Sequence, residues 1–282
     1  MPADPTASTD WSKTAVGLGL ARAPWTPSPE DGRLLLEAVT AHLAGRRSLV
    51  AVLGVTPALI QLTWPEGATI LAVEANPAMI RSQWRSHPKI PSAVVCGRWE
   101  TLPLPSGSVA TVVGDGSLNA LPYASYPGLF REVARVLAPA GVFVLRCFVR
   151  PEIPMEIAKI EQEVAGRRHL TSAPFRLRLC TALADSDGSL VLGSLLERFN
   201  AHFPDRRRLA DAAGWEMAEV DRFDMDRGSK IELTFPTLAE LAAHAQPYFA
   251  IEEVRHGSYP LAELCPRVTF VPTGAGASQP PR

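Results

Sequence analysis

One stretch, residues 48–76, constrains the fold more than any other part of the chain. Its sequence, SLVAVLGVTPALIQLTWPEGATILAVEAN, places one apolar run before a glycine and a second apolar run before an acid. Runs rich in branched apolar residues are typical of strands buried in a parallel sheet. Between the two runs, Thr56 suits the N-cap of a short helix and Pro57 suits its first position. The stretch therefore predicts a strand–helix–strand unit whose second strand ends at Glu74.

Glu74 follows Gly54 at the spacing of about 20 residues at which nucleotide-binding α/β folds place an acid for the ribose hydroxyls. In such folds, ligands bind at the carboxyl ends of the strands, against helix N-termini. Asn76 and Pro77 repeat the cap-and-proline start for a next helix, residues 77–86. A solvated glutamate near a helix cap is the alternative interpretation of Glu74. The agreement of strand, turn, cap and acid favours a ligand.

Composition and charge exclude several classes of protein. A chain of 282 residues has room for one large domain or two small ones, and 46% hydrophobic with 20% charged residues is typical of a globular protein. The net charge of −1 argues against a general nucleic-acid binder, although a local basic patch stays open. No apolar run is long enough to span a membrane, and the first residues, MPADPTASTD, lack a secretory signal pattern. We therefore predict a cytoplasmic protein.

The cysteines and histidines show no metal-binding pattern. The six histidines form no HExxH motif, and the four cysteines are far apart with no CxxC pair. We expect the cysteines to be small buried apolar residues rather than metal ligands or disulfide partners. They are Cys96, Cys147, Cys180 and Cys265.

The remaining chain continues the alternation of strands and helices up to about residue 150. Ser28 caps a predicted helix that runs to about Ala44, and a short helix is predicted over residues 11–23. The termini, rich in Pro, Ala, Ser, Thr and Gly, are expected to be disordered. Alternation of this kind predicts a parallel, doubly wound sheet. The further predicted elements are strands at 92–96, 109–113, 142–149, 249–256 and 267–271 and a helix at 127–137; the last two strands form an antiparallel hairpin.

The alternation of strands and helices ends at residue 151, because residues 151–247 are predicted to be almost entirely helical. This is too much chain for one crossover, so we expect a helical insertion beside the sheet, acting as a lid. Its aromatic residues either pack the insertion or also line a pocket; they are Phe175, Phe199, Phe203 and Trp215. Its basic clusters, Arg167-Arg168 and Arg206-Arg207-Arg208, are interpreted as solvated helix faces.

Three blocks of sequence resemble the class I S-adenosylmethionine-dependent methyltransferases. They are LAVEANPAMI, GRWETLPLPSGSVATVVGDGSLNAL and LFREVARVLAPAGVFVLRCF, in the order and spacing of that family. The resemblance implies an α/β fold with a doubly wound, mostly parallel seven-stranded sheet, the Rossmann-like methyltransferase fold, with a helical insertion before the last antiparallel hairpin. The implied organisation is an N-terminal arm (1–28), a cofactor-binding core (29–150), the helical insertion (151–248), the terminal hairpin (249–272) and a tail (273–282).

The same resemblance implies S-adenosylmethionine as the cofactor and identifies its candidate site. Two positions depart from the family: the first loop, VLGVTP, has one glycine, and Arg98 stands where an aspartate often binds the adenine amine. Trp99 is expected to stack on the adenine instead. Asp115 is the candidate catalytic residue, near the cofactor's amino group or sulfonium, with a turn or cap role as the alternative. The candidate cofactor-binding residues are Gly54, Thr56, Pro57, Glu74, Ala75, Asn76, Met79, Arg98, Trp99, Asp115 and Gly116.

The function predicted in this way is methyl transfer to a small-molecule acceptor, with no metal, nucleic acid or membrane expected as a partner. The alternative is a protein of this fold that binds the cofactor or a partner without transferring a methyl group. A nicotinamide-dependent oxidoreductase would also use the strand–helix–strand unit and its acid, but the glycine fingerprint is missing. Tyr123, Tyr126, Arg146 and Arg150 lie where a substrate would be met, although a structural role is the simpler interpretation of each. The acceptor and the oligomeric state are left open.

Overall fold

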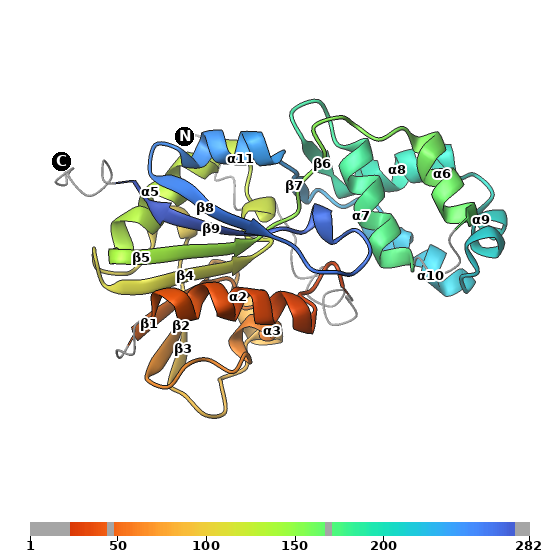
Figure 1. The fold of residues 1–282 in the computed structure, drawn as a ribbon. Coiled ribbons are helices and arrows are strands. Elements are labelled where there is room, and N and C mark those ends of the chain that lie inside the picture. Colours follow the sequence, from red (N-terminus) through yellow and green to blue (C-terminus); the bar gives the residue numbers. More distant parts are fainter. Residues whose placement is uncertain (1–22, 44–47, 167–170, 274–282) are drawn as a thin grey trace, which may run out of the picture.

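The computed structural model describes residues 23–43, 48–166 and 171–273, which form an α/β core and a helical part beside it (Figure 1). The predicted N-terminal tail at 1–10, all of the predicted tail at 273–282 except Thr273, nearly all of the predicted helix at 11–23 and the pair Arg167-Arg168 lie outside these residues. No helix among the described residues has the length and apolar character needed to cross a bilayer.

The core is built on a seven-stranded sheet in the order β3-β2-β1-β4-β5-β9-β8. Strands β1 to β5 are parallel, and β9 runs antiparallel to both β5 and β8. The predicted doubly wound, mostly parallel sheet with a terminal antiparallel hairpin is therefore confirmed. The strands are β1 (Ser48–Leu53), β2 (Ala68–Glu74), β3 (Ser92–Cys96), β4 (Val109–Asp115), β5 (Leu137–Arg146), β8 (Phe249–Arg255) and β9 (Arg267–Pro272).

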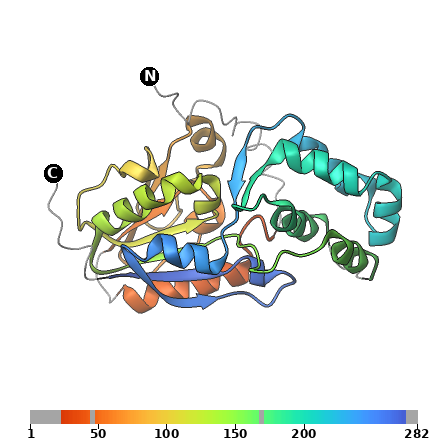
Figure 2. The same ribbon diagram turned by 90° about the horizontal axis from the view of Figure 1, so that it is seen from above.

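Helices cover both faces of this sheet (Figure 2). One face packs against α2 (Pro29–His42), α3 (Pro57–Ile60) and α4 (Pro77–Gln83), and the other against α5 (Tyr126–Val136) and α11 (Leu238–Ala245). Ser28 caps α2 as predicted, because its hydroxyl accepts the N–H of Asp31. Between β3 and β4 the chain forms only the short 3-10 helix η1 (Trp99–Thr101) and loops.

The helical part has its own hydrophobic core. It contains α6 (Ile157–Gly166), α7 (Ser172–Leu183), α8 (Leu192–His202), α9 (Arg206–Ala213), α10 (Met217–Asp221) and a two-stranded sheet of β6 (Ser189–Val191) and β7 (Glu232–Thr234). The strands of this small sheet were not predicted. The sequence analysis included the segment that forms α11 in the helical insertion, and the structure corrects this. Leu241 and Ala245 of α11 are buried in the same cluster as residues of α5 and the main sheet, so α11 packs with the core.

Buried hydrogen bonds fasten the helical part to the core. The Asn119 side chain, which follows β4, donates to the carbonyls of Phe148 and Thr234 at 2.7 and 2.6 Å and accepts the N–H of Phe148 at 2.9 Å. The Thr234 hydroxyl lies 2.7 Å from the Tyr126 hydroxyl. Phe148 leaves the sheet and Thr234 returns toward it, so both connections of the helical part are held at one point.

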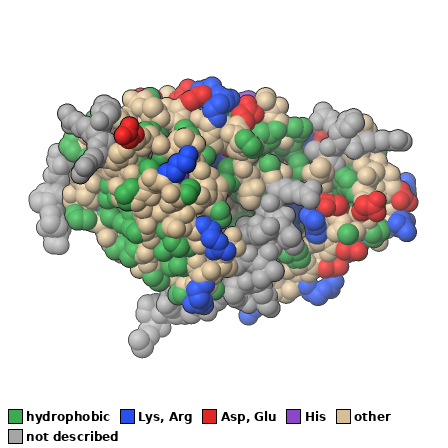
Figure 3. Space-filling view, turned by 90° about the horizontal axis from the view of Figure 1, so that it is seen from below, with side chains coloured by type: hydrophobic (Ala, Val, Ile, Leu, Met, Phe, Trp, Pro, Cys, Tyr) green, Lys and Arg blue, Asp and Glu red, His purple; other side chains and the backbone are tan. Residues whose placement is uncertain are grey.

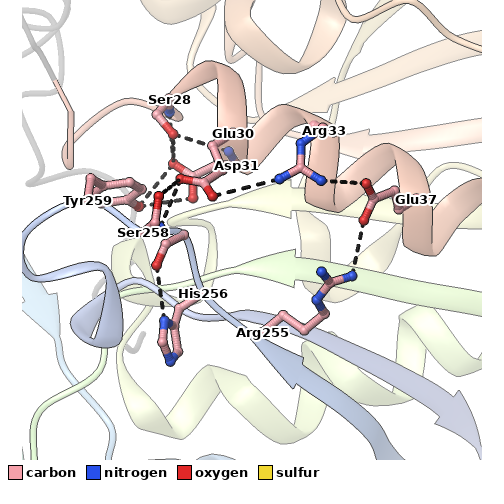
Figure 4. Close-up of polar contacts among 10 residues, drawn as sticks. Ser28, Glu30, Asp31, Arg33, Glu37, Arg255, His256, Ser258 and Tyr259 are labelled. Carbon is pink, nitrogen blue, oxygen red and sulfur yellow. Dashed lines mark hydrogen bonds and ion pairs between the residues drawn. The ribbon is translucent and has the colours of Figure 1, made fainter.

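The connection between β8 and β9 also joins the two parts (Figure 4). At its start, the Ser258 N–H and the Tyr259 hydroxyl bind Glu30 and Asp31 of α2 at 2.8 and 2.9 Å. Further along, Leu264 is buried in the core of the helical part. The helical part therefore lies opposite the carboxyl ends of β1 to β5, and it is attached to the core at two places.

Candidate functional site

Three residues from three different elements meet at the carboxyl ends of β1 and β2. Gly54, directly after β1, has a φ of +99°, a conformation that favours glycine. A methyl group at its Cα would lie 3.6 Å from Cζ2 of Trp99 and 3.8 Å from Oε2 of Glu74. The missing side chain of Gly54 thus leaves space between a carboxylate and an indole ring. The sequence predicted all three residues for one site, and the structure brings them together.

Glu74 ends β2 with one carboxylate oxygen held in place. Its Oε1 accepts the backbone N–H of Asn76 at 2.7 Å. Burial raises the pKa of this carboxyl group, and the N–H groups of Asn76 and Ala75 partly offset the rise. A carboxylate that is desolvated and fixed on one side is prepared to accept further hydrogen bonds through Oε2.

The backbone N–H groups of Ala75 and Asn76 bind the Glu74 carboxylate, and Met79 follows in helix α4. The Asn76 side chain caps α4 by accepting the N–H groups of Ala78 and Met79 at 2.8 and 3.4 Å. Met79 is half-buried against the cluster beneath α3 and α4. The predicted helix start at Asn76 is confirmed by this cap, and it fixes the backbone that holds Glu74.

Trp99 lies across the ends of β1 and β2. Its indole Nε1 donates to the carbonyl of Val73 at 2.7 Å, and the ring is half-buried beside Gly54. The neighbouring Arg98 is paired with Glu100 at 3.1 Å. The indole is therefore at the strand ends, where sequence reasoning expected it, in a fixed orientation.

The loop after β1 is shaped by residues other than glycine. Thr56 is the N-cap residue of α3 but makes no side-chain cap hydrogen bond, and Pro57 opens the helix. The buried Ser117, which follows β4, donates its hydroxyl to the Leu53 carbonyl at 2.9 Å. Ser117 was not predicted from the sequence. Its position two residues after the end of β4, near Gly114, is the feature that could have indicated it.

Asp115 is engaged by a buried arginine. Its Oδ1 lies 2.6 Å from Nε of Arg146, the neighbouring residue on β5, and the side chains are 6% and 2% exposed. Burial alone would lower the pKa of Arg146, but the attraction of Asp115 outweighs it and the pKa lies above its usual value. Gly116 follows Asp115, and a methyl group at its Cα would lie 3.3 Å from Cε2 of Phe148. The pairing favours a structural role for Asp115, as a buried ion-pair partner at the end of β4 rather than as the turn or helix-cap residue considered from the sequence.

The four residues predicted to lie where a substrate would be met contact other protein groups in the structure. Arg146 is buried, Tyr126 binds Thr234, and Arg150 pairs with Glu240 at 2.6 Å. Tyr123 stacks on the His244 ring with 5.5 Å between centroids. These contacts favour the structural interpretation of Tyr126, Arg146 and Arg150.

The aromatic residues of the insertion pack against one another. The rings of Phe199 and Phe223 stack with 4.1 Å between centroids, and Phe175 and Phe203 lie around them. Phe175, Phe199 and Phe203 are buried and Trp215 half-buried against the same cluster. The hypothesis that these rings line a pocket is wrong for the three phenylalanines, because their faces are used inside the helical part. Arg206 is not simply solvated either, since it pairs with Asp224 at 2.9 Å.

The cysteines and the acids form no metal centre in the described part of the chain. Cys147, Cys180 and Cys265 are buried, and burial raises the pKa of each thiol to about 12. Cys96 differs from the expectation because it is exposed at the end of the edge strand β3.

Comparisons with known proteins agree with this arrangement. Residues 53–145 match the protein family described as "Methyltransferase domain". This match includes Gly54, Glu74, Trp99 and Asp115 and ends within β5. No curated protein sequence matches the chain.

Several solved structures share the fold. One, from Rhodobacter sphaeroides and described among the Zn-dependent alcohol dehydrogenases, has a TM-score of 0.58 at 15% identity and covers 94% of this chain and 100% of its own. The CcbJ methyltransferase of Streptomyces caelestis has a TM-score of 0.55 at 15% identity, covering 94% and 99%. The PH0226 protein of Pyrococcus horikoshii OT3 has a TM-score of 0.50 at 14% identity, covering 91% and 99%. At such identities the similarity concerns the fold alone.

Proposed function

We propose that this chain, whose α/β core belongs to the class I S-adenosylmethionine-dependent methyltransferase superfamily, transfers a methyl group from S-adenosylmethionine to a small-molecule acceptor. The observation that carries the proposal is the meeting of Gly54, Glu74 and Trp99 at the carboxyl ends of β1 and β2 within the matched domain. Carboxyl ends of parallel strands are where nucleotide-like ligands bind in such sheets.

The residues present suit an adenosyl group. The half-buried Glu74 has Oε1 fixed by Asn76, which leaves Oε2 to accept ribose hydroxyls. Gly54 lets the backbone approach the ligand closely, since a Cβ there would reach toward both Glu74 and Trp99. The Trp99 indole, oriented by Val73, offers a flat surface on which adenine can stack.

The chemistry demands little of the protein beyond binding and alignment. The bound cofactor supplies an activated methyl group on a sulfonium. The chain's own residues hold the adenosine end at β1 and β2 and exclude water. Asn119 and Thr234 keep the helical part fixed opposite these strand ends. Orientation of the acceptor against that wall is the contribution we assign to the insertion.

The helical part also favours a small acceptor. It is attached on both sides of the strand ends, by Asn119 at one side and by the β8–β9 connection at the other. We place the acceptor between the strand ends and the helical part, where a small molecule fits more readily than the surface of a folded macromolecule.

Calorimetry with S-adenosylhomocysteine tests the proposal. Hydrogen bonds to a charged group contribute about 1.5–3 kcal/mol each, so Glu74→Ala should weaken binding at least about tenfold. Glu66→Ala, at an exposed glutamate just before β2, is the matched control and should bind as the unaltered chain does. No binding by the unaltered chain, or equal binding by the folded Glu74→Ala variant, would exclude the site.

A second function is favoured by two observations. Thr56 and Pro57 occupy positions that are commonly glycine in this superfamily. Asp115 forms a buried ion pair with Arg146. A chain with these features would bind the cofactor as a structural ligand without transferring its methyl group. Binding in calorimetry without labelled methyl transfer across a broad panel of acceptors would favour this function over the first.

A further inference from the structure

The two edges of the main sheet differ sharply in how they are protected. Edge strand β8 carries exposed Glu252, Glu253 and Arg255 and an irregular register between Ile251 and Glu253. Charges and bulges of this kind prevent pairing with other chains. The opposite edge strand, β3, has the sequence SAVVC, with no charge, no proline and no bulge.

The outer backbone groups of β3 are unpaired in the described structure. Pro91 and Gly97 bond to β2 through their carbonyl and N–H groups, at 2.9 and 3.1 Å. In a parallel pair the bonding residues alternate, so Ala93 and Val95 also face β2. Ser92, Val94 and Cys96 therefore point their N–H and C=O groups away from the sheet.

The surface around this edge is apolar and incompletely covered. No residue of α4 or β3 is buried, although both elements carry large apolar side chains. The missing helix between β3 and β4 leaves one side of the edge to the short η1 alone. Half-buried apolar residues lie in β3 and in the segment before it: Met79, Ile80, Trp84, Ile90, Val94 and Val95.

The same surface is basic. Between Ala75 and Trp99 the sequence has no aspartate or glutamate. The exposed Arg81, Arg85 and Lys89 form no ion pair within the part of the chain that the structure describes. Seen from below, the side on which β3 lies in Figure 1, the core shows mostly hydrophobic and uncharged surface with a few basic side chains and some acidic ones along its margin, whereas the helical part carries both acidic and basic side chains (Figure 3). A chain with a net charge of −1 thus carries three exposed basic side chains in the segment that ends with edge strand β3.

We propose that residues 77–97 dock an acidic protein partner, which adds an extended strand to the free edge of β3. The strand would bond to the outward backbone groups of Ser92, Val94 and Cys96. Its acidic side chains would meet Arg81, Arg85 and Lys89, and alternate apolar side chains would cover the half-buried surface.

A second copy of this chain fits the edge less well. Two β3 strands pairing antiparallel would bring the start of one strand beside the end of the other. Lys89, before β3, would then approach Arg98 of the second copy, and two surfaces without acids would face each other. Like charges placed together oppose such a contact.

Three labelled probes test the proposal with the full chain: a short peptide alternating valine with glutamate, the same peptide with lysine in place of glutamate, and a single-stranded RNA oligonucleotide. Binding is followed by fluorescence anisotropy and by hydrogen exchange of the β3 amides. We expect the glutamate peptide alone to bind and to slow exchange at Ser92, Val94 and Cys96.

Two variants separate the backbone contribution from the charge contribution. Val94→Pro removes an outward N–H without touching the bonds to β2, and proline is tolerated on edge strands; Val94→Thr is its matched control. We expect Val94→Pro, and separately the combined Arg81→Glu, Arg85→Glu and Lys89→Glu change, to weaken peptide binding at least about tenfold. Val94→Thr should bind as the unaltered chain does.

Several results would overturn the proposal. One is equal binding of the lysine peptide, or no binding of either peptide. Another is RNA binding that the charge changes abolish and Val94→Pro leaves intact, which would assign the surface to nucleic acid. A third is a dimer in sedimentation that Val94→Pro dissociates, which would make a second copy the occupant.

Discussion

Asp115 and Arg146 sit side by side on β4 and β5, with 2.6 Å between Oδ1 and Nε, and both side chains are almost fully buried. Arg146 also donates to the Pro24 carbonyl at 2.8 Å and lies 3.9 Å from Asp31 of α2. One guanidinium thereby links the sheet, α2 and the chain before α2.

Removing one partner of this pair should destabilise the protein strongly. Asp115→Ala leaves the Arg146 charge buried with less compensation, and breaking a buried pair in this way costs about 3–5 kcal/mol. The measurement is the free energy of unfolding in urea. Glu37→Ala is the control, because its ion pairs with Arg33 and Arg255 are exposed and should contribute little to stability. Equal losses in the two variants would show that the buried pair does not hold the strands together.

The pKa of Glu74 leads to a prediction about pH. Burial holds this pKa above 4.5, its ordinary value, so the folded state disfavours the ionised carboxylate. The cost is absent below about pH 4.5, where both states are protonated, and grows as pH rises through the folded pKa. Glu74→Gln should therefore be at least as stable as the unaltered chain at neutral pH.

Thermal melts of the ligand-free protein at about pH 4 and pH 7 check this expectation. The advantage of Glu74→Gln should disappear at the lower pH, while its affinity for S-adenosylhomocysteine should be reduced at neutral pH. If Glu74 belongs to a ligand site, its carboxylate should lower the stability of the ligand-free protein and raise the affinity for the ligand. A Glu74→Gln variant that melts lower than the unaltered chain at pH 7, with unchanged affinity, would indicate a structural acid instead.

The sheet and part of the site were predictable from the sequence because both follow local patterns. Apolar runs marked strands such as residues 48–53, and the rule that ligands bind at strand ends brought Gly54, Glu74 and Trp99 to one place. Gly54 directly follows β1, Glu74 ends β2 and Trp99 lies three residues after the end of β3, so the order of the strands brings all three to the same end of the sheet.

The remaining features depend on contacts between distant segments. The strands at 189–191 and 232–234 are too short to give a periodic pattern, and they pair across about 40 residues. The pairing of Asp115 with Arg146 follows from the register of β4 against β5, which the sequence does not state. Helix α11 reads like the other helices, and only its packing against α5 assigns it to the core.

Asn119 should control how firmly the helical part is held. In Asn119→Ala, the carbonyls of Phe148 and Thr234 lose a buried donor, at a cost of about 1–3 kcal/mol for each unsatisfied group. We expect lower stability together with faster hydrogen exchange in residues 232–236. Asn200→Ala, whose side chain binds only Arg206 among described residues, is the control. Unchanged exchange in residues 232–236 would show that other contacts fasten the insertion.

The last prediction separates the two consequences of a side chain at Gly54. Its φ of +99° is one that L-residues rarely adopt, so Gly54→Ala should cost about 1–2 kcal/mol of stability. The new methyl group would also lie 3.6 Å from Trp99 and 3.8 Å from Glu74, in the space assigned to the adenosyl group. Affinity for S-adenosylhomocysteine should therefore fall as well.

Gly107→Ala is a matched control for this variant. Gly107 has a φ of +65°, and a methyl group there would meet nothing within 4 Å. It should share the loss of stability, measured by urea unfolding, and keep full affinity in calorimetry. If Gly54→Ala loses stability but binds as tightly as Gly107→Ala, the space between Glu74 and Trp99 is not where the ligand lies, because a group placed there would have displaced it.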